Sequence, residues 1–195
     1  MGKREITAAD IMSMEDYAEV RRDRRRAVME IKKLRRVAVG PDATFYFENY
    51  ATMWHQVHEM LFIEKGGEAQ LAGELAAYNP LIPKGGELVA TLMFEIDDAD
   101  ARARFLAGLG GVEKTVTLSV ADRVIQALAE DDVERTTAGG KASSIHFLRF
   151  PFSPAQVAAF RQVGTRAVLA IGHKAYGHMA VIPDQVREAL AGDFD

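Results

Sequence analysis

Residues 88–96 read Leu-Val-Ala-Thr-Leu-Met-Phe-Glu-Ile, a run of apolar and β-prone side chains that predicts a strand. Further strands are predicted at residues 115–120, 123–129, 143–152 and 166–172, and helices at residues 97–109, 153–163 and 183–191. These strands follow one another without a regular crossover helix, which favours antiparallel pairing. The sequence therefore predicts an α+β fold, with a mainly antiparallel sheet packed with helices.

The first part of the chain is mostly helical and contains one long basic helix. Helices are predicted at residues 13–37, 48–65 and 68–78, with a short strand at residues 43–47. Residues 21–36 hold nine Lys or Arg and two acids, a formal charge of +7, so the rest of the chain carries −11 of the total −4. We expect a single domain over residues 1–195, with residues 1–80 mostly helical and residues 81–195 forming the sheet.

The composition excludes several classes of site. The chain has no cysteine, which excludes a thiolate zinc site, an iron–sulfur centre and a cysteine nucleophile within it. It contains no phosphate-binding loop, dinucleotide-binding fingerprint or nucleophile elbow. The first residues have no apolar signal core and no window approaches transmembrane length, so we expect a cytoplasmic protein with no membrane attachment.

The helix at residues 48–65 carries the main candidate site. It holds the only tryptophan and two of the five histidines, and helical geometry puts Thr52, Gln56 and Glu59 within roughly 60° of one another, bordered by His55. A buried carboxylate needs a cation, a metal or several donors. The functional interpretation is that Glu59 lines a pocket or binds a metal. The alternative is a satisfied structural network or a half-exposed helix face.

Two polar residues in apolar strands extend this hypothesis. Glu95 shares a strand face with Thr91 and Met93, and His146 shares one with Leu148 and Phe150. Together with Glu59 they would form a carboxylate–imidazole set suited to iron, manganese or zinc. A histidine on an apolar face is also typical of a hydrogen-bonded core residue.

Residues 172–178 read Gly-His-Lys-Ala-Tyr-Gly-His, and we expect a loop there. Its two histidines, five residues apart, are candidates for a metal site or a general acid. The alternative is a surface loop with incidental histidines.

Several strings resemble a bacterial family known as domain of unknown function 3501, and together they span nearly the whole chain. They occupy residues 35–37 with 40–41, 44–49, 56–61, 78–83, 90–95 and 146–150. The family pattern is matched by Glu48, Asn49, Thr52, Gln56 and Glu59, whereas His55 and His58 depart from it. Asn79, Glu95 and His146 are added to these five residues, so the candidate pocket comprises Glu48, Asn49, Thr52, Gln56, Glu59, Asn79, Glu95 and His146.

The resemblance implies neighbouring genes for a rubrerythrin-like protein and an iron–sulfur oxidoreductase, and hence a role in redox or peroxide defence. Our leading hypothesis is an accessory protein of such a system, acting through a protein partner and a metal or small molecule near Glu59. The second hypothesis is a metal-dependent enzyme that uses Glu59, Glu95 and His146. The third is a nucleic-acid-binding regulator acting through residues 21–36, which the apolar stripe of that helix and the acidic body argue against. Homo-oligomerisation stays open.

Overall fold

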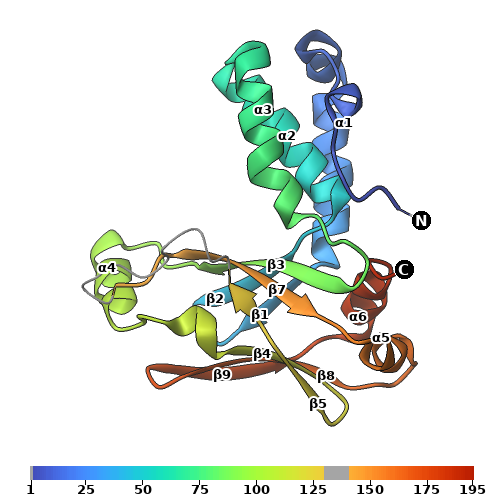
Figure 1. Cartoon of the computed structure of the whole chain (residues 1–195). Coiled ribbons are helices and arrows are strands. Elements are labelled where there is room, and N and C mark those ends of the chain that lie inside the picture. Colours follow the sequence, from blue (N-terminus) through green and yellow to red (C-terminus); the bar gives the residue numbers. More distant parts are fainter. Residues whose placement is uncertain (1, 130–140) are drawn as a thin grey trace.

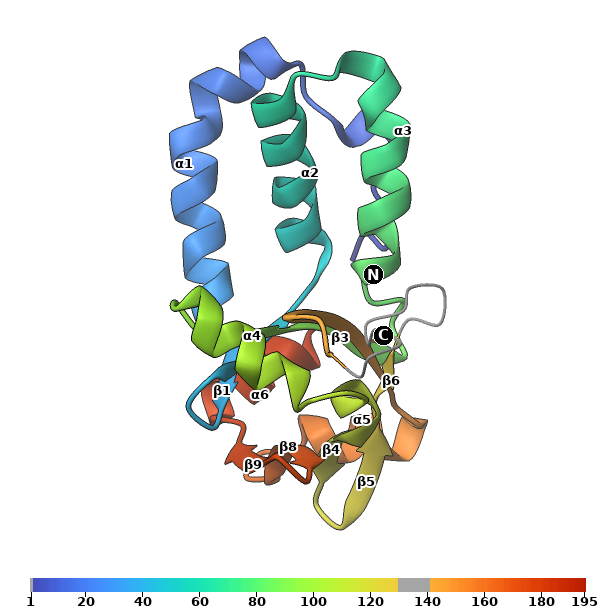
Figure 2. The same ribbon diagram turned by 90° about the vertical axis from the view of Figure 1, so that its left-hand side faces the viewer.

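The computed structural model describes residues 2–129 and 141–195 (Figure 1). Three helices form a layer that we call the helical arm, and this arm stands above a body that contains the sheets. The helices of the arm are α1 (Met14–Lys33), α2 (Tyr50–Glu64) and α3 (Gly67–Tyr78). Figure 2 shows them side by side, with α2 in the middle.

Local sequence signals set the ends of the arm helices. The Ser13 hydroxyl accepts the N–H of Asp16 and begins α1. Asn49 and Thr52 form a reciprocal capping box that begins α2. Because α2 lies between the other two helices, its apolar side chains form the core of the arm. This core contains Ile6, Met53, Val57, Leu61, Leu81, Ile82 and Val89.

The first sheet is the part of the body on which the arm packs. Its strand order is β1-β2-β3-β7-β6, with the strands spanning Arg36–Val39, Ala43–Phe47, Glu87–Phe94, Ile145–Pro151 and Leu128–Ala129. One face of this sheet lies in the main core. The other face contributes Val89 and Phe147 to the core of the arm, so β3 and β7 carry the arm on their outer surface.

The second sheet closes the main core from the opposite side. Its order is β5-β4-β8-β9, with strands Arg123–Gln126, Val116–Val120, Ala167–His173 and Tyr176–Val181. Leu92 and Phe150 of the first sheet share one buried cluster with Leu118 and Leu169 of the second. The remaining helices are α4 (Ala99–Ala107), α5 (Pro154–Arg161) and α6 (Asp184–Ala191), and each adds a buried side chain to this cluster. Single 3₁₀ turns span Ala8–Asp10, Asn79–Leu81 and Val112–Thr115.

The predicted α+β class and antiparallel pairing are confirmed, and the structure adds that the strands divide between two sheets. The predicted strand at residues 123–129 crosses from one sheet to the other. Its first part, β5, pairs with β4, and its last part, β6, pairs with β7. Ala127 lies buried between them, at the point where the strand changes sheets.

The prediction of a loop at residues 172–178 was wrong. β8 runs to His173 and β9 begins at Tyr176, so the segment forms a β-hairpin. β9 is an edge strand with mostly exposed side chains, which removes the alternation that marks a half-buried strand.

Among residues 2–129 and 141–195, no helix combines the length and the apolar character needed to cross a membrane.

Tyr176 joins the two sheets at this hairpin. Its buried hydroxyl accepts the N–H groups of Asp42 and Ala43, at 2.9 and 3.0 Å, and donates to the Val39 carbonyl at 2.9 Å. These three backbone groups belong to the end of β1, the turn after it and the start of β2. Gly40 in that turn has φ +75°, and a Cβ there would lie 2.6 Å from the Tyr176 hydroxyl oxygen, so the contact requires glycine.

We therefore expect Tyr176→Phe to lower the free energy of unfolding by about 1–3 kcal/mol, because the buried N–H of Ala43 and the partly buried N–H of Asp42 lose their acceptor. Chemical denaturation measures this change. Tyr46→Phe is the matched control, since the Tyr46 hydroxyl donates to the exposed carboxylate of Glu95. Its effect should stay within about 0.5 kcal/mol. Equal losses in the two variants would contradict the role given to Tyr176.

Candidate functional site

Glu59 faces α1 and is held by two residues of that helix. The Tyr17 hydroxyl donates to Oε1 at 2.8 Å, and the Arg21 guanidinium donates to both carboxylate oxygens at 2.9 Å. The Arg21 guanidinium, with the Tyr17 hydroxyl, lowers the pKa of Glu59 to about 2 although partial burial opposes this shift. The expectation that this carboxylate needs a partner is met by a cation of the same chain.

Two histidines of α2 make further polar contacts in the arm, one with α1 and one with the segment before it. His55 Nδ1 lies 3.2 Å from the Tyr17 hydroxyl oxygen. His58 is fully buried: its Nε2 accepts the N–H of Met12 at 3.1 Å and its Nδ1 contacts the Trp54 carbonyl at 2.7 Å. This pattern requires neutral His58 with the proton on Nδ1. Burial lowers the pKa of both histidines, which agrees with neutral rings.

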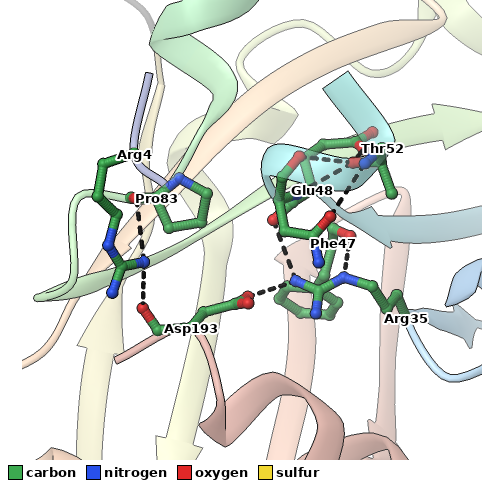
Figure 3. Close-up of polar contacts among 8 residues, drawn as sticks. Arg4, Arg35, Phe47, Glu48, Thr52, Pro83 and Asp193 are labelled. Atoms are coloured by element: carbon green, nitrogen blue, oxygen red, sulfur yellow. Dashed lines mark hydrogen bonds and ion pairs between the residues drawn. The ribbon is translucent and has the colours of Figure 1, made fainter. Parts of the chain in front are cut away.

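Glu48, Asn49 and Thr52 lie together where α2 meets the first sheet. The buried Glu48 carboxylate accepts the Thr52 hydroxyl at 2.6 Å and the Thr91 hydroxyl of β3 at 2.9 Å. Figure 3 shows the contact of Glu48 with Thr52. These residues of the candidate pocket therefore fix the base of α2 to β3.

A buried ion pair lies beside this cluster. Arg35 forms an ion pair with Asp193, and its guanidinium also donates to the carbonyls of Phe47 and Glu48, at 2.9 and 3.1 Å (Figure 3). Arg4 donates to the Asp193 carbonyl at 2.6 Å. Burial raises the pKa of Asp193, and the charge of Arg35 opposes that shift.

The other members of the candidate pocket have separate partners. Gln56 reaches the Tyr78 hydroxyl of α3 at 3.5 Å, and Asn79 makes two hydrogen bonds with the backbone of Ile6. Glu95 is exposed beyond the end of β3 and accepts the Tyr46 hydroxyl at 2.7 Å. The eight residues therefore do not line a common pocket.

The proposed metal ligands also lie apart. His146 is buried in the main core, where Nε2 lies 2.9 Å from the Ser143 carbonyl and Nδ1 lies 3.9 Å from a carboxylate oxygen of Glu113. Glu59 is in the arm and Glu95 is on the surface. In the part of the chain that the structure describes, no three His, Cys, Asp or Glu side chains form a group able to hold a metal. The metal set of Glu59, Glu95 and His146 is thus not assembled.

The histidines of the β8–β9 hairpin are separated as well. His173 is buried and its Nδ1 accepts the N–H of Ala175 at 3.2 Å. His178 is exposed and packs against the Tyr176 ring, with centroids 4.4 Å apart. Each histidine thus has its own structural contacts.

Open grooves occur on the arm. The arginine groove, about 430 Å³, is lined by Ala18, Arg21, Arg22, Arg25, Arg26, Met29 and Phe62. The tip groove, about 670 Å³, is lined mainly by apolar residues of α1, α2, α3 and the segment before α1, and it shares Ala18 and Phe62 with the arginine groove. The tryptophan groove, about 330 Å³, includes Arg24, Ala27, Trp54 and His55 and shares no lining residue with the other two.

Sequence reasoning missed the partners of Glu59 and the ion pair of Arg35. Tyr17 and Arg21 are four residues apart, as are His55 and Glu59, so each pair lies on one face of its helix. This four-residue spacing on both α1 and α2 could have predicted a contact between the two helices. Asp193 carries no such signal, because it lies in a short segment after α6.

Comparisons with known proteins give a family and a similar solved structure. A family model described as "Protein of unknown function (DUF3501)" matches residues 5–194. A solved structure, described as a novel protein of unknown function from Burkholderia pseudomallei K96243, has a TM-score of 0.90 and 38% identity, covering 97% of this chain and 99% of that one. No curated relative matches the chain.

We expect Glu59→Gln to lower the free energy of unfolding at neutral pH by about 1–2 kcal/mol, because a two-oxygen ion pair is lost. The folded-state pKa of Glu59 lies below its ordinary value of 4.5, so its contribution is complete above that pH and is lost as the pH falls towards about 2. Denaturation of both proteins across this range should show their difference shrinking. Glu30→Gln is the control, since Glu30 pairs with Lys33 on the exposed side of α1. A difference independent of pH would contradict this assignment.

We expect Arg35→Leu to cost about 3–5 kcal/mol of folding stability, because it leaves the Asp193 carboxylate buried without its cation. The double variant Arg35→Leu/Asp193→Leu should lose less than the sum of the two single variants, since neither charge is then left alone. Equilibrium denaturation of the four proteins gives the coupling. Simple additivity would show that the ion pair does not couple these residues.

Proposed function

The chain belongs to the DUF3501 family, and from that premise and its geometry we propose that it is an accessory protein that binds a protein partner through its helical arm. The resemblance seen in the sequence implies a redox system. A rubrerythrin-like protein and an iron–sulfur oxidoreductase are accordingly the first partners to test.

The observation that carries this proposal is a row of exposed cations on α1. Arg22 and Arg25 are exposed and form no ion pair with a carboxylate of residues 2–129 and 141–195. Residues 21–33 of α1 hold seven Lys or Arg and two acids, a formal charge of +5, whereas the rest of the chain has −9, so positive charge is concentrated on this part of the helix. A concentrated charge of one sign steers association with a surface of the opposite sign.

An apolar side chain exposed beside these cations supports a protein partner. Met29, which lines the arginine groove together with Arg22 and Arg25, is 61% exposed. Protein interfaces combine such apolar groups with arginine, which is enriched at interfaces relative to the rest of the surface. A site that binds a polyanion by charge alone does not require exposed apolar side chains.

The state of Glu59 favours binding over acid–base chemistry. A carboxylate whose pKa is about 2 stays ionised at neutral pH and neither gives up nor takes a proton readily there. Its hydrogen bonds to Arg21 and Tyr17 hold α1 against α2. We infer that this residue keeps the arm rigid, as a preformed binding surface requires.

The test is co-purification of the tagged chain with the two redox proteins at low salt. Wild type is compared with an arm variant that carries four charge reversals, at Arg22, Arg24, Arg25 and Arg26. We expect the partner to be lost, because reversing the cations replaces attraction by repulsion.

A body variant with the same change in charge is the control. It reverses the exposed Arg104, Arg123, Arg166 and Lys174, which lie outside the arm. Retention of the partner by the arm variant, or its loss from both variants alike, would refute binding through the arm.

A further inference from the structure

One side of α1 carries a stripe of one small, two basic and one apolar residue. Ala18, Arg22, Arg25 and Met29 are spaced by four, three and four residues, so they fall within about 60° of one another around the helix. All four are exposed and all four line the arginine groove. The spacing is that of a helix surface that packs against a second helix.

The stripe continues into an apolar surface. Ala18 and Phe62 line both the arginine groove and the tip groove, so the two form one continuous depression. The tip groove adds Ile11, Met12 and Leu71. Measured along α1 from Met14 to Met29, the depression is about 22 Å long, which is the length of a helix of about 15 residues.

The cations of this depression are available to an outside ligand. Arg21 is engaged by Glu59 and Arg26 by Asp23, whereas Arg22 and Arg25 have no carboxylate partner within the described ranges. Arginine side chains pair with carboxylates through two parallel hydrogen bonds. Their position at one end of an apolar groove calls for a ligand that is acidic at one end and apolar along its length.

We propose, building on the proposed function, that the partner contributes an amphipathic helix of about four turns that lies in this depression. Its apolar residues, at three- and four-residue steps, pack on Met29, Phe62 and the tip groove. Acidic residues near one end pair with Arg22 and Arg25. This is the helix-in-groove mode of recognition.

Other ligand classes fit less well. Small-molecule sites enclose most of their ligand, but Ala18, Arg22, Arg25 and Met29 are all exposed. A nucleic acid presents phosphates along its whole length, and Glu15 of the tip groove would repel them.

The experiment measures binding of a fluorescent 16-residue synthetic peptide to the full chain by anisotropy. The peptide has leucines at three- and four-residue steps, glutamates beside them in one half and glutamines in the other. A second peptide has lysine in place of each glutamate. We expect the glutamate peptide to bind and the lysine peptide to bind at least about tenfold more weakly.

Two pairs of variants locate the site. Ala18→Trp fills the junction of the two grooves, whereas Ala27→Trp lies nine residues on, on the opposite side of α1 and in the tryptophan groove. Arg25→Glu removes a proposed cation, whereas Arg24 lies over Trp54 in that opposite groove. Ala18→Trp and Arg25→Glu should each weaken peptide binding by about tenfold or more, and Ala27→Trp and Arg24→Glu by less than about twofold.

The proposal would be overturned by no binding of the glutamate peptide, by equal effects of Ala18→Trp and Ala27→Trp, or by displacement of the peptide by a DNA oligonucleotide of the same charge. A wild-type dimer that Ala18→Trp converts to a monomer would assign the groove to a second copy of the chain and would overturn it too. If co-purification is abolished by Ala27→Trp and not by Ala18→Trp, binding through the arm stands and this groove is not its site.

Discussion

The ion pair between Arg35 and Asp193 is the constraint on which the arrangement of the arm and the body depends. Arg35 lies at the junction of α1 and β1, and Asp193 follows α6 near the end of the chain. The same guanidinium binds two carbonyls just before α2, and Arg4 binds the Asp193 backbone. Four separate segments of the chain thus meet at one buried ion pair, which fixes the direction in which α1 and α2 leave the sheet.

Polar contacts within the apolar core of the arm then fix how its helices pack together. Glu59 with Tyr17 and Arg21 joins α1 to α2, and His58 joins α2 to the segment before α1. A buried polar group without a partner is costly, so such contacts select one register of the helices where apolar packing alone would allow several. The surface of α1 that faces away from α2 is therefore held in a defined position.

The sequence predicted much of this architecture, and the misses have physical causes. Periodicity placed Glu59 on one face of α2 with Thr52 and Gln56, and His146 on one strand face with Leu148 and Phe150, because such placements depend only on neighbours along the chain. Periodicity does not show which element each side chain meets. The prediction therefore grouped into one pocket residues that have separate partners in the structure. The edge strand β9 was missed because its exposed side chains lack alternation, and the division of residues 123–129 was missed because no Gly or Pro marks the bend at Ala127.

The strand that crosses at Ala127 has a consequence for cooperativity. Its two parts, β5 and β6, are one continuous backbone that is hydrogen-bonded to both sheets, so neither sheet can separate without disturbing the other. The arm is different, because among the described residues its own core takes only Val89 and Phe147 from the sheet. Amide protons of the body should thus exchange through one global opening, whereas those of the arm exchange through a smaller, partial one.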